Sequence, residues 1–96
     1  MTGHWIQRVN ERIGNVDPSL LWDGLQWAID QRRTDLVEYV GRTSREGTRA
    51  FRFCVPDGRT FVAIINTNLG VPITVLDKGE FLAGNSKFDR KVRVQG

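Results

Sequence analysis

The chain has 96 residues, of which 40% are hydrophobic, and a formal net charge of +3 at pH 7. This length suits one compact domain and leaves little chain for a second core. The single cysteine excludes an internal disulfide, and no Cys/His cluster offers the ligands of a zinc site. We therefore expect neither a metal nor another cofactor, although carboxylates alone can hold magnesium. No apolar run approaches the roughly 18 residues of a membrane span, so we expect no membrane partner and a cytoplasmic location.

Arginine dominates the positive charge, with 11 arginines against 3 lysines. Arginine forms paired, planar hydrogen bonds to phosphate that lysine cannot form. Residues 42–59 and 87–93 each carry a net charge of +3, whereas residues 13–41 carry −3. This distribution is typical of a protein that presents one basic face to nucleic acid. The alternative is an ordinary solvated surface of mixed charge.

Two helices are predicted in the first third of the chain. The first covers residues 4–13 and ends at Gly14, and the second begins after Asp17 as N-cap, with Pro18 in the first position. The second helix runs through the stretch "PSLLWDGLQWAIDQRR" to residue 33. Their apolar faces comprise Trp5, Ile6, Val9 and Ile13 in the first helix and Leu21, Trp22, Leu25, Ala28 and Ile29 in the second, whereas Trp27 falls off the face.

After Thr34 the apolar period changes from helical to alternating, which predicts four strands. They are "LVEYVGR" (36–42), "RAFRFCV" (49–55), "TFVAIIN" (60–66) and "VPITVLD" (71–77), with turns at "PDGR" and "TNLG". In the second strand, alternation places Phe51, Phe53 and Val55 on one face and Ala50, Arg52 and Cys54 on the other. We expect Cys54 to be buried and inert, since no base lies beside it in sequence.

These elements predict an α+β fold, with two N-terminal helices packed on one face of a four-stranded antiparallel meander sheet. We expect one domain over residues 1–82. Residues 83–96 are a basic C-terminal tail, whose "KVRV" forms an edge strand or an arm that orders only on a ligand.

The first helix carries a ridge of His4, Arg8 and Arg12, because residues four apart advance only about 40° around a helix. Histidine can accept and release a proton near neutral pH, and an arginine one turn away can hold a phosphate for it. Glu11 offsets part of this charge. The alternative is a frayed first turn whose histidine faces water.

A second group of candidates lies on the predicted strands. Arg42 and Arg52 project from strands, and Arg52 shares its face with small neighbours that leave room for a ligand. Tyr39 can stack on a base, and Arg45 and Arg49 lie in the polar loop "RTSREGTR", which is suited to following a phosphate backbone. Basic residues on the solvent side of a sheet, and an ordinary loop, are the alternative.

An H-x-x-x-R arrangement on the first helix ("HWIQR"), a second helix, and a meander ending in an apolar strand with an internal threonine ("PITVLD") resemble the barnase/EndoU/colicin/RelE-type (BECR) ribonuclease superfamily. The resemblance covers roughly residues 4–77. Members with this layout are metal-independent RNA-cleaving toxins and effectors, so the resemblance implies a toxin-type ribonuclease, which acts in the cytoplasm of a target cell if it is a secreted effector.

The resemblance implies His4 as acid or base, Arg8 as phosphate ligand and Thr74 as a hydroxyl on the sheet floor, to which strand direction adds Arg42 and Arg52. Without a metal, RNA is cut by its own 2′-hydroxyl, which leaves a 2′,3′-cyclic phosphate and requires a base, an acid and cations. The single histidine can serve as either the base or the acid, and Glu38 or Tyr39 is the candidate for the other of these two groups. Binding of RNA (tRNA, mRNA or rRNA) is assigned to Arg12, Tyr39, Arg45, Arg49, Lys87, Arg90 and Lys91.

Two other classes remain open. The same arginines suit a non-catalytic module that binds nucleic acid or, like small phage-encoded inhibitors, blocks an acidic partner protein. A structural subunit of a larger assembly is the third possibility. If a toxin of this kind has an antitoxin or immunity protein, we expect it to be acidic and to cover the basic face.

Overall fold

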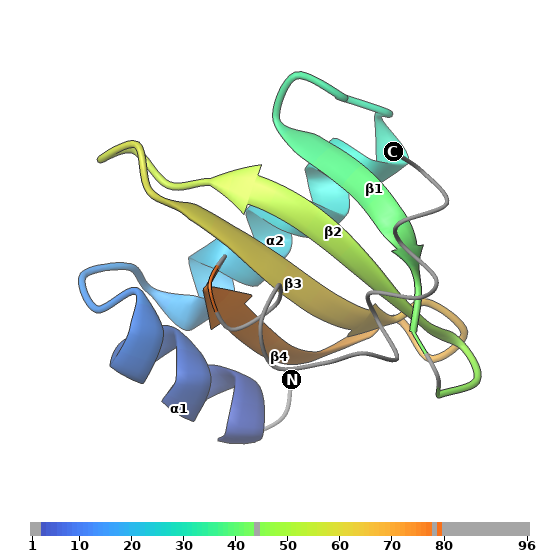
Figure 1. The fold of residues 1–96 in the computed structure, drawn as a ribbon, viewed down its shortest axis with the longest axis horizontal. Coiled ribbons are helices and arrows are strands. Elements are labelled where there is room, and N and C mark those ends of the chain that lie inside the picture. The colour runs from blue at the N-terminus through green and yellow to red at the C-terminus, as the bar shows by residue number, and fades with distance from the viewer. Residues whose placement is uncertain (1–2, 44, 78, 80–96) are drawn as a thin grey trace.

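A computed structural model describes residues 3–43, 45–77 and 79. Its elements are α1 (Gly3–Arg12), α2 (Pro18–Asp30), β1 (Val37–Arg42), β2 (Thr48–Cys54), β3 (Thr60–Asn66) and β4 (Val71–Asp77). The strands form one antiparallel sheet in the order β1-β2-β3-β4 (Figure 1). The predicted α+β meander is confirmed, and the basic tail predicted over residues 83–96 lies outside the described residues.

Helix α2 begins as predicted and ends earlier. Asp17 Oδ1 accepts hydrogen bonds from two backbone N–H groups of the first turn, at 2.8 and 3.2 Å. The helix ends at Asp30 rather than at residue 33, because Arg32 adopts a φ of 55° and turns the chain away. The backbone N–H of Arg33 then donates to the Ala28 carbonyl at 2.9 Å, which satisfies an otherwise unpaired carbonyl of the last turn.

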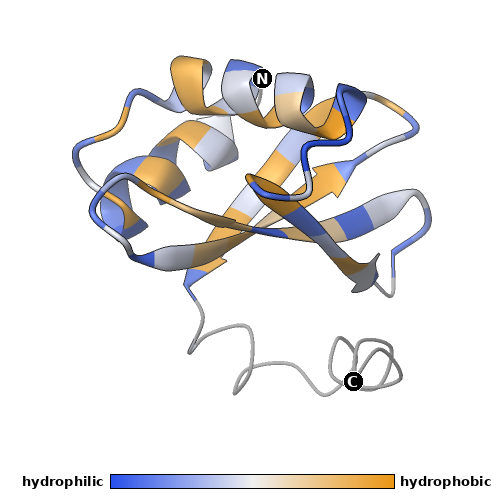
Figure 2. Ribbon diagram, turned by 90° about the horizontal axis from the view of Figure 1, so that it is seen from above, coloured by the Kyte–Doolittle hydropathy of each residue, from blue (hydrophilic) through white to orange (hydrophobic). Residues whose placement is uncertain are grey.

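Both helices cover the same face of the sheet (Figure 2), which we call the inner face. Trp5 is fully buried there. Its ring packs edge-on against the ring of Trp22, with the two ring centroids 6.3 Å apart, and its Nε1 donates a hydrogen bond to the Pro18 carbonyl at 3.1 Å. Ile6 was predicted on the apolar arc but is 40% exposed, whereas Trp27 is half exposed as predicted. The buried inner core comprises Trp5, Val9, Ile13, Leu25, Ala28, Val37, Phe51, Phe53, Val55, Phe61, Ala63, Ile65 and Val75.

The sheet face turned away from the helices, called the outer face, follows from the strand register. Arg52 pairs with Glu38 on β1 and with Val62 on β3, so these side chains share that face. Cys54 also lies on it and is exposed, so the prediction of a buried thiol is wrong. Among the described residues, the apolar cluster of this face consists of strand residues, with Ala50, Val62 and Ile64 buried and Val40, Ile73 and Leu76 half-buried around them.

Arg59, in the turn between β2 and β3, ties this turn to the end of α1. Its Nη2 donates to the Ile13 carbonyl at 2.9 Å, and its guanidinium lies 5.4 Å from the centre of the Phe61 ring. Asp57 accepts from the Arg59 backbone N–H at 3.0 Å and from Nε at 2.8 Å. The backbone hydrogen bond, followed by the guanidinium, lowers the pKa of Asp57 below its ordinary value. One arginine therefore joins a turn, an aromatic ring and a helix terminus.

Across the described ranges, no helix combines the length and the apolar character that crossing a membrane requires.

Candidate functional site

A β-bulge in β1 decides which arginines face each other. Tyr39 pairs with Phe51, but Gly41 pairs with Ala50, so β1 carries one residue more than β2 at this point. Beyond the bulge Arg42 lies directly opposite Arg49. Without the extra residue, simple alternation places Arg42 on the outer face. The bulge therefore turns it to the inner side of the sheet, where it meets a second arginine.

The loop between β1 and β2 is fixed by two threonines. Thr43 and Thr48 are buried, and their hydroxyl groups hydrogen-bond to each other. Thr48 Oγ1 donates to the Arg45 carbonyl at 2.6 Å, and Thr43 Oγ1 accepts from the Arg45 N–H at 3.2 Å. The backbone of Arg45 is thus held on both its polar groups, while its side chain remains available to a ligand.

The same loop is anchored to the turn between β3 and β4 at Gly47. Its carbonyl accepts hydrogen bonds from the Thr67 N–H at 2.9 Å and from Thr67 Oγ1 at 3.2 Å. Gly47 has a φ of 79°, and a Cβ there would lie 2.7 Å from Asn68 Nδ2. Only glycine satisfies both the dihedral angle and the close approach.

Three arginines, Arg42, Arg45 and Arg49, form what we call the basic hairpin surface. Arg49 Nη1 donates to Thr67 Oγ1 at 2.8 Å, and among the described residues none of the three forms an ion pair with a carboxylate. Like charges directly opposite in a sheet are destabilising, so the pair Arg42–Arg49 is expected to attract an anion. A polar hollow of about 380 Å³ lies here, lined by Arg42, Thr43, Arg45, Glu46, Gly47, Thr48, Arg49 and Asn68.

The predicted ridge on α1 exists, but its arginines share a carboxylate. Arg8 Nε donates to His4 Nε2 at 3.5 Å, which confirms that these side chains meet. Arg8 Nη1 and Arg12 Nη1 lie 3.1 and 3.5 Å from Glu11 Oε1. A hydrogen bond from Gln7, followed by the charge of Arg8 and then of Arg12, lowers the pKa of Glu11. Glu11 therefore competes with any phosphate for Arg8.

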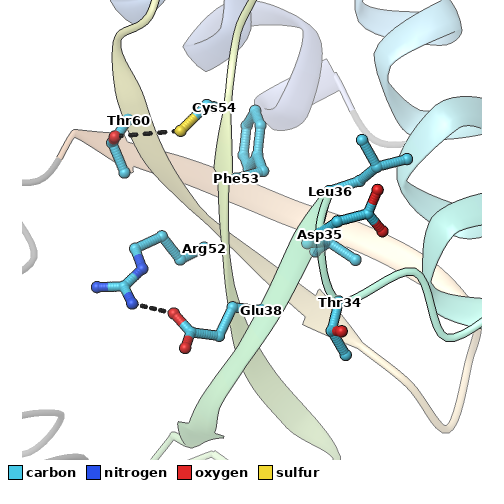
Figure 3. Close-up of a pocket in the computed structure, with 9 residues that line it drawn as sticks. Thr34, Asp35, Leu36, Glu38, Arg52, Phe53, Cys54 and Thr60 are labelled. Atoms are coloured by element: carbon cyan, nitrogen blue, oxygen red, sulfur yellow. Dashed lines mark hydrogen bonds and ion pairs between the residues drawn. The ribbon is translucent and has the colours of Figure 1, made fainter.

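Arg52 also has a partner. It forms an ion pair with Glu38 on the outer face, at a hollow of about 320 Å³ shown in Figure 3. Cys54 and Thr60 lie at another end of this hollow, 3.4 Å apart between Sγ and Oγ1. Thr74 pairs with Ile64, so its hydroxyl belongs to the outer face as well. The outer face thus presents a neutralised arginine and two or more hydroxyl groups.

The candidates fall into three separate places. His4, Arg8 and Arg12 lie on α1, which packs against β4 at one edge of the sheet. The basic hairpin surface lies at the loop that joins β1 to β2, away from α1 (Figure 1), and Arg52 and Thr74 lie on the outer face. Tyr39 is on the inner side of β1, half exposed, with its ring 5.4 Å from Phe51. Lys87, Arg90 and Lys91 lie outside the described residues.

The residues that hold the hairpin, Thr43, Thr48, Thr67 and Asn68, were not predicted as part of a site. Their signal in the sequence is weak: threonine and asparagine beside glycine in "RTSREGTR" and "NTNLG" favour side-chain to backbone bonds in turns. Within the described ranges, no three His, Cys, Asp or Glu side chains gather closely enough to hold a metal ion.

Comparison with models of protein families, with curated proteins and with solved structures finds no match for this chain.

Proposed function

We propose that the protein binds RNA by its phosphate backbone through the basic hairpin surface. The observation that carries this proposal is the facing pair Arg42–Arg49, joined by Arg45, with no carboxylate paired to any of them among the described residues. Arginine binds phosphate through paired hydrogen bonds, and the anchored loop supplies a fixed position for these groups. RNA, rather than another polyanion, is chosen from the sequence resemblance to the BECR ribonucleases.

The hollow matches a phosphate better than an apolar ligand. Its walls carry arginine, threonine and asparagine side chains, and Glu46 is the one carboxylate among the described residues that line it. The net charge of the lining residues is +2, since three arginines stand against Glu46. An anion placed between Arg42 and Arg49 relieves their mutual repulsion, and this relief adds to the affinity of the surface for the anion.

The test is the salt dependence of binding to a labelled single-stranded RNA, with the native chain compared with Arg42→Gln, Arg45→Gln and Arg49→Gln. For single strands the slope of log K against log salt is about −0.7 per phosphate contact, so three contacts predict about −2.1. Each substitution is expected to reduce this slope by about 0.7.

Arg33→Gln is the matched control, because it removes the same charge from a residue that pairs with Asp35 away from the hairpin. A triple hairpin variant that keeps the native affinity and slope contradicts the proposal. A DNA strand of the same sequence, bound equally well, widens the ligand class to single-stranded nucleic acid.

A second candidate function is RNA cleavage without a metal, favoured by the contact between His4 Nε2 and Arg8 Nε at 3.5 Å on an exposed part of α1. In this reaction the RNA 2′-oxygen forms a bond to the adjacent phosphorus and loses its proton to a base. The bond from phosphorus to the 5′-oxygen breaks, and the leaving oxygen receives a proton from an acid. His4 is proposed for one of the two proton transfers, and Arg8 for stabilising the phosphorane.

Neither residue named for the other acid or base lies beside His4. Glu38 and Tyr39 lie on β1, at the opposite edge of the sheet from β4, against which α1 packs. Glu38 is in addition paired with Arg52. For this reason RNA binding is the leading proposal and cleavage the second.

The cleavage proposal is tested with tRNA and total RNA in excess chelator, using the native chain and His4→Ala. Products ending in a 2′,3′-cyclic phosphate that disappear with His4→Ala support it. Asn10→Ala, an exposed position on the same helix, is the matched control. RNA that stays intact while the native chain still binds it refutes cleavage and leaves binding as the function.

A further inference from the structure

An aromatic pair lies next to the arginine pair on the inner face of β1 and β2. Tyr39 lies opposite Phe51, and the next pair on this face is Arg42 opposite Arg49. On β2 the two pairs are two residues apart, which is about 7 Å along a strand. On β1 they are three residues apart, because the bulge adds one residue between them. The bulge therefore places an aromatic side chain beside two arginine side chains on one patch of the sheet.

Tyr39 is half exposed although it lies on the inner face. Along β1 the inner-face residues change from buried Val37 to Tyr39, which is 50% exposed, and then to exposed Arg42. The Tyr39 ring nevertheless has a support, since its centroid is 5.4 Å from that of the buried Phe51 ring, with 53° between the two planes. A ring that packs against a neighbour and is still half open to solvent can receive a flat ligand at little cost in ordering.

We infer that Tyr39 and the pair Arg42–Arg49 form a subsite for one nucleotide of single-stranded RNA. The unpaired base stacks on the Tyr39 ring, and a phosphate of the same strand lies between the two guanidinium groups. Aromatic rings stack on unpaired bases of any kind, and arginine binds phosphate through paired hydrogen bonds. The inference rests on the proposed binding of RNA at the basic hairpin surface and adds to it that the RNA is single-stranded there.

Double-stranded RNA does not fit both parts of this subsite. In a duplex each base is paired and stacked on its neighbours, and proteins contact such RNA through its phosphates, its 2′-hydroxyl groups and its shape. A duplex can therefore reach the arginines, but it offers no free base face to Tyr39. The contribution of Tyr39 to affinity is expected for single strands and not for duplexes.

Trp27 is the alternative stacking site, because it is also 50% exposed. Its ring already has a cationic neighbour: the Arg33 guanidinium carbon lies 5.4 Å from the ring centroid, and Arg33 pairs with Asp35. Helix α2, which carries Trp27, contains two aspartates and neither arginine nor lysine. These carboxylates repel a phosphate, whereas the arginine pair beside Tyr39 attracts one. The surroundings therefore favour Tyr39.

The direct test uses the native chain and two labelled oligonucleotides of equal length. One is an RNA of adenine and cytosine, which does not pair with itself, and the other is its abasic counterpart, with the same phosphates and no bases. We expect the abasic strand to bind about 5-fold more weakly or less tightly still, because stacking on an aromatic ring is lost. The slope of log K against log salt should be the same for both strands, since the phosphate contacts remain.

Substitutions assign the effect to one ring. Tyr39→Ala is expected to lower affinity for the adenine–cytosine RNA about 5-fold or more, and to leave affinity for the abasic strand and for an RNA duplex unchanged. Tyr39→Phe keeps the ring and is expected to bind as the native chain does. Trp27→Ala is the matched control, because it removes an equally exposed aromatic ring away from the hairpin and should not change affinity.

The outcomes separate this inference from the proposed function. Equal affinity for the two strands, with Arg42→Gln still weakening both, overturns the inference and leaves phosphate binding at the hairpin intact. A base effect that persists in Tyr39→Ala, or that is lost in Trp27→Ala, also overturns it, because the base then stacks elsewhere. Absence of binding to either strand refutes the proposed function and the inference together. If Tyr39→Ala does not fold, Tyr39→Ser or Tyr39→Leu takes its place, and the abasic comparison on the native chain needs no variant.

Discussion

Replacing Arg42 by glutamine is expected to stabilise the free protein and to weaken the proposed RNA binding. Arg42 faces Arg49 across β1 and β2, and neither has a carboxylate partner among the described residues. Like charges directly opposite in an antiparallel pair oppose folding by about 0.2–1 kcal/mol. For a domain of this size about 1 kcal/mol corresponds to 4–8 °C, so Arg42→Gln is expected to raise Tm by roughly 1–8 °C.

The assay is thermal unfolding at two ionic strengths, with Arg42→Lys as the control that keeps the charge. The Debye length is about 30 Å at 0.01 M salt and about 3 Å at 1 M. The gain of Arg42→Gln should therefore be largest at low salt and shrink at high salt, and Arg42→Lys should show no gain. The reasoning is refuted if Arg42→Gln lowers Tm, or if its gain is the same at both salt concentrations.

Three further changes test the fold and its connections. Trp5→Ala empties a fully buried site and is expected to cost about 3–5 kcal/mol in urea unfolding; a loss below about 1 kcal/mol contradicts the described core. Gly47→Ala places a side chain at a positive φ and against Asn68 Nδ2, so it is expected to lower the free energy of unfolding by about 1–3 kcal/mol; little change in that free energy would indicate a mobile loop instead. Arg59→Ala is expected to cost about 1 kcal/mol, at the lower end for a charged hydrogen bond because the side chain is half exposed. In the same variant the pKa of Asp57, followed by carboxyl NMR, should rise part of the way towards 3.8, since the backbone hydrogen bond remains. Because the pKa of Asp57 is lowered by folding, its contribution to stability is complete above about 3.8 and is lost as the pH falls below it, so a native Asp57 that titrates at or above 3.8 contradicts this assignment.

Hydrophobic periodicity was sufficient to predict the helices and strands, because apolar spacing differs sharply between residues 4–30 and residues 36–77. It failed at the end of α2, where Arg32 adopts a positive φ that glycine or asparagine usually supplies. It also failed for Cys54, because an apolar residue type alone does not tell which face of a sheet is exposed.

The candidate site was only partly predictable, since its grouping depends on strand register. The contact between His4 and Arg8 follows from helical spacing and was predicted. The pairing of Arg42 with Arg49 requires the bulge beside Gly41. A glycine inside a strand pattern is a weak signal of such a bulge, but it does not tell which residues then face each other. The same bulge separates Arg42 from Arg52, which the sequence placed in one group.

The anchoring of Gly47 to Thr67 has a kinetic consequence. In the folded protein Arg45 is held by Thr43 and Thr48 of its own hairpin, and Gly47 is held by Thr67 of the next turn. Fixing a flexible residue costs about 1–2 kcal/mol of backbone entropy, and here that loss occurs on folding rather than on binding. A surface prepared in this way has no slow rearrangement to complete after contact. If the hairpin binds RNA as proposed, association should be governed by electrostatic encounter, and its rate should fall with added salt.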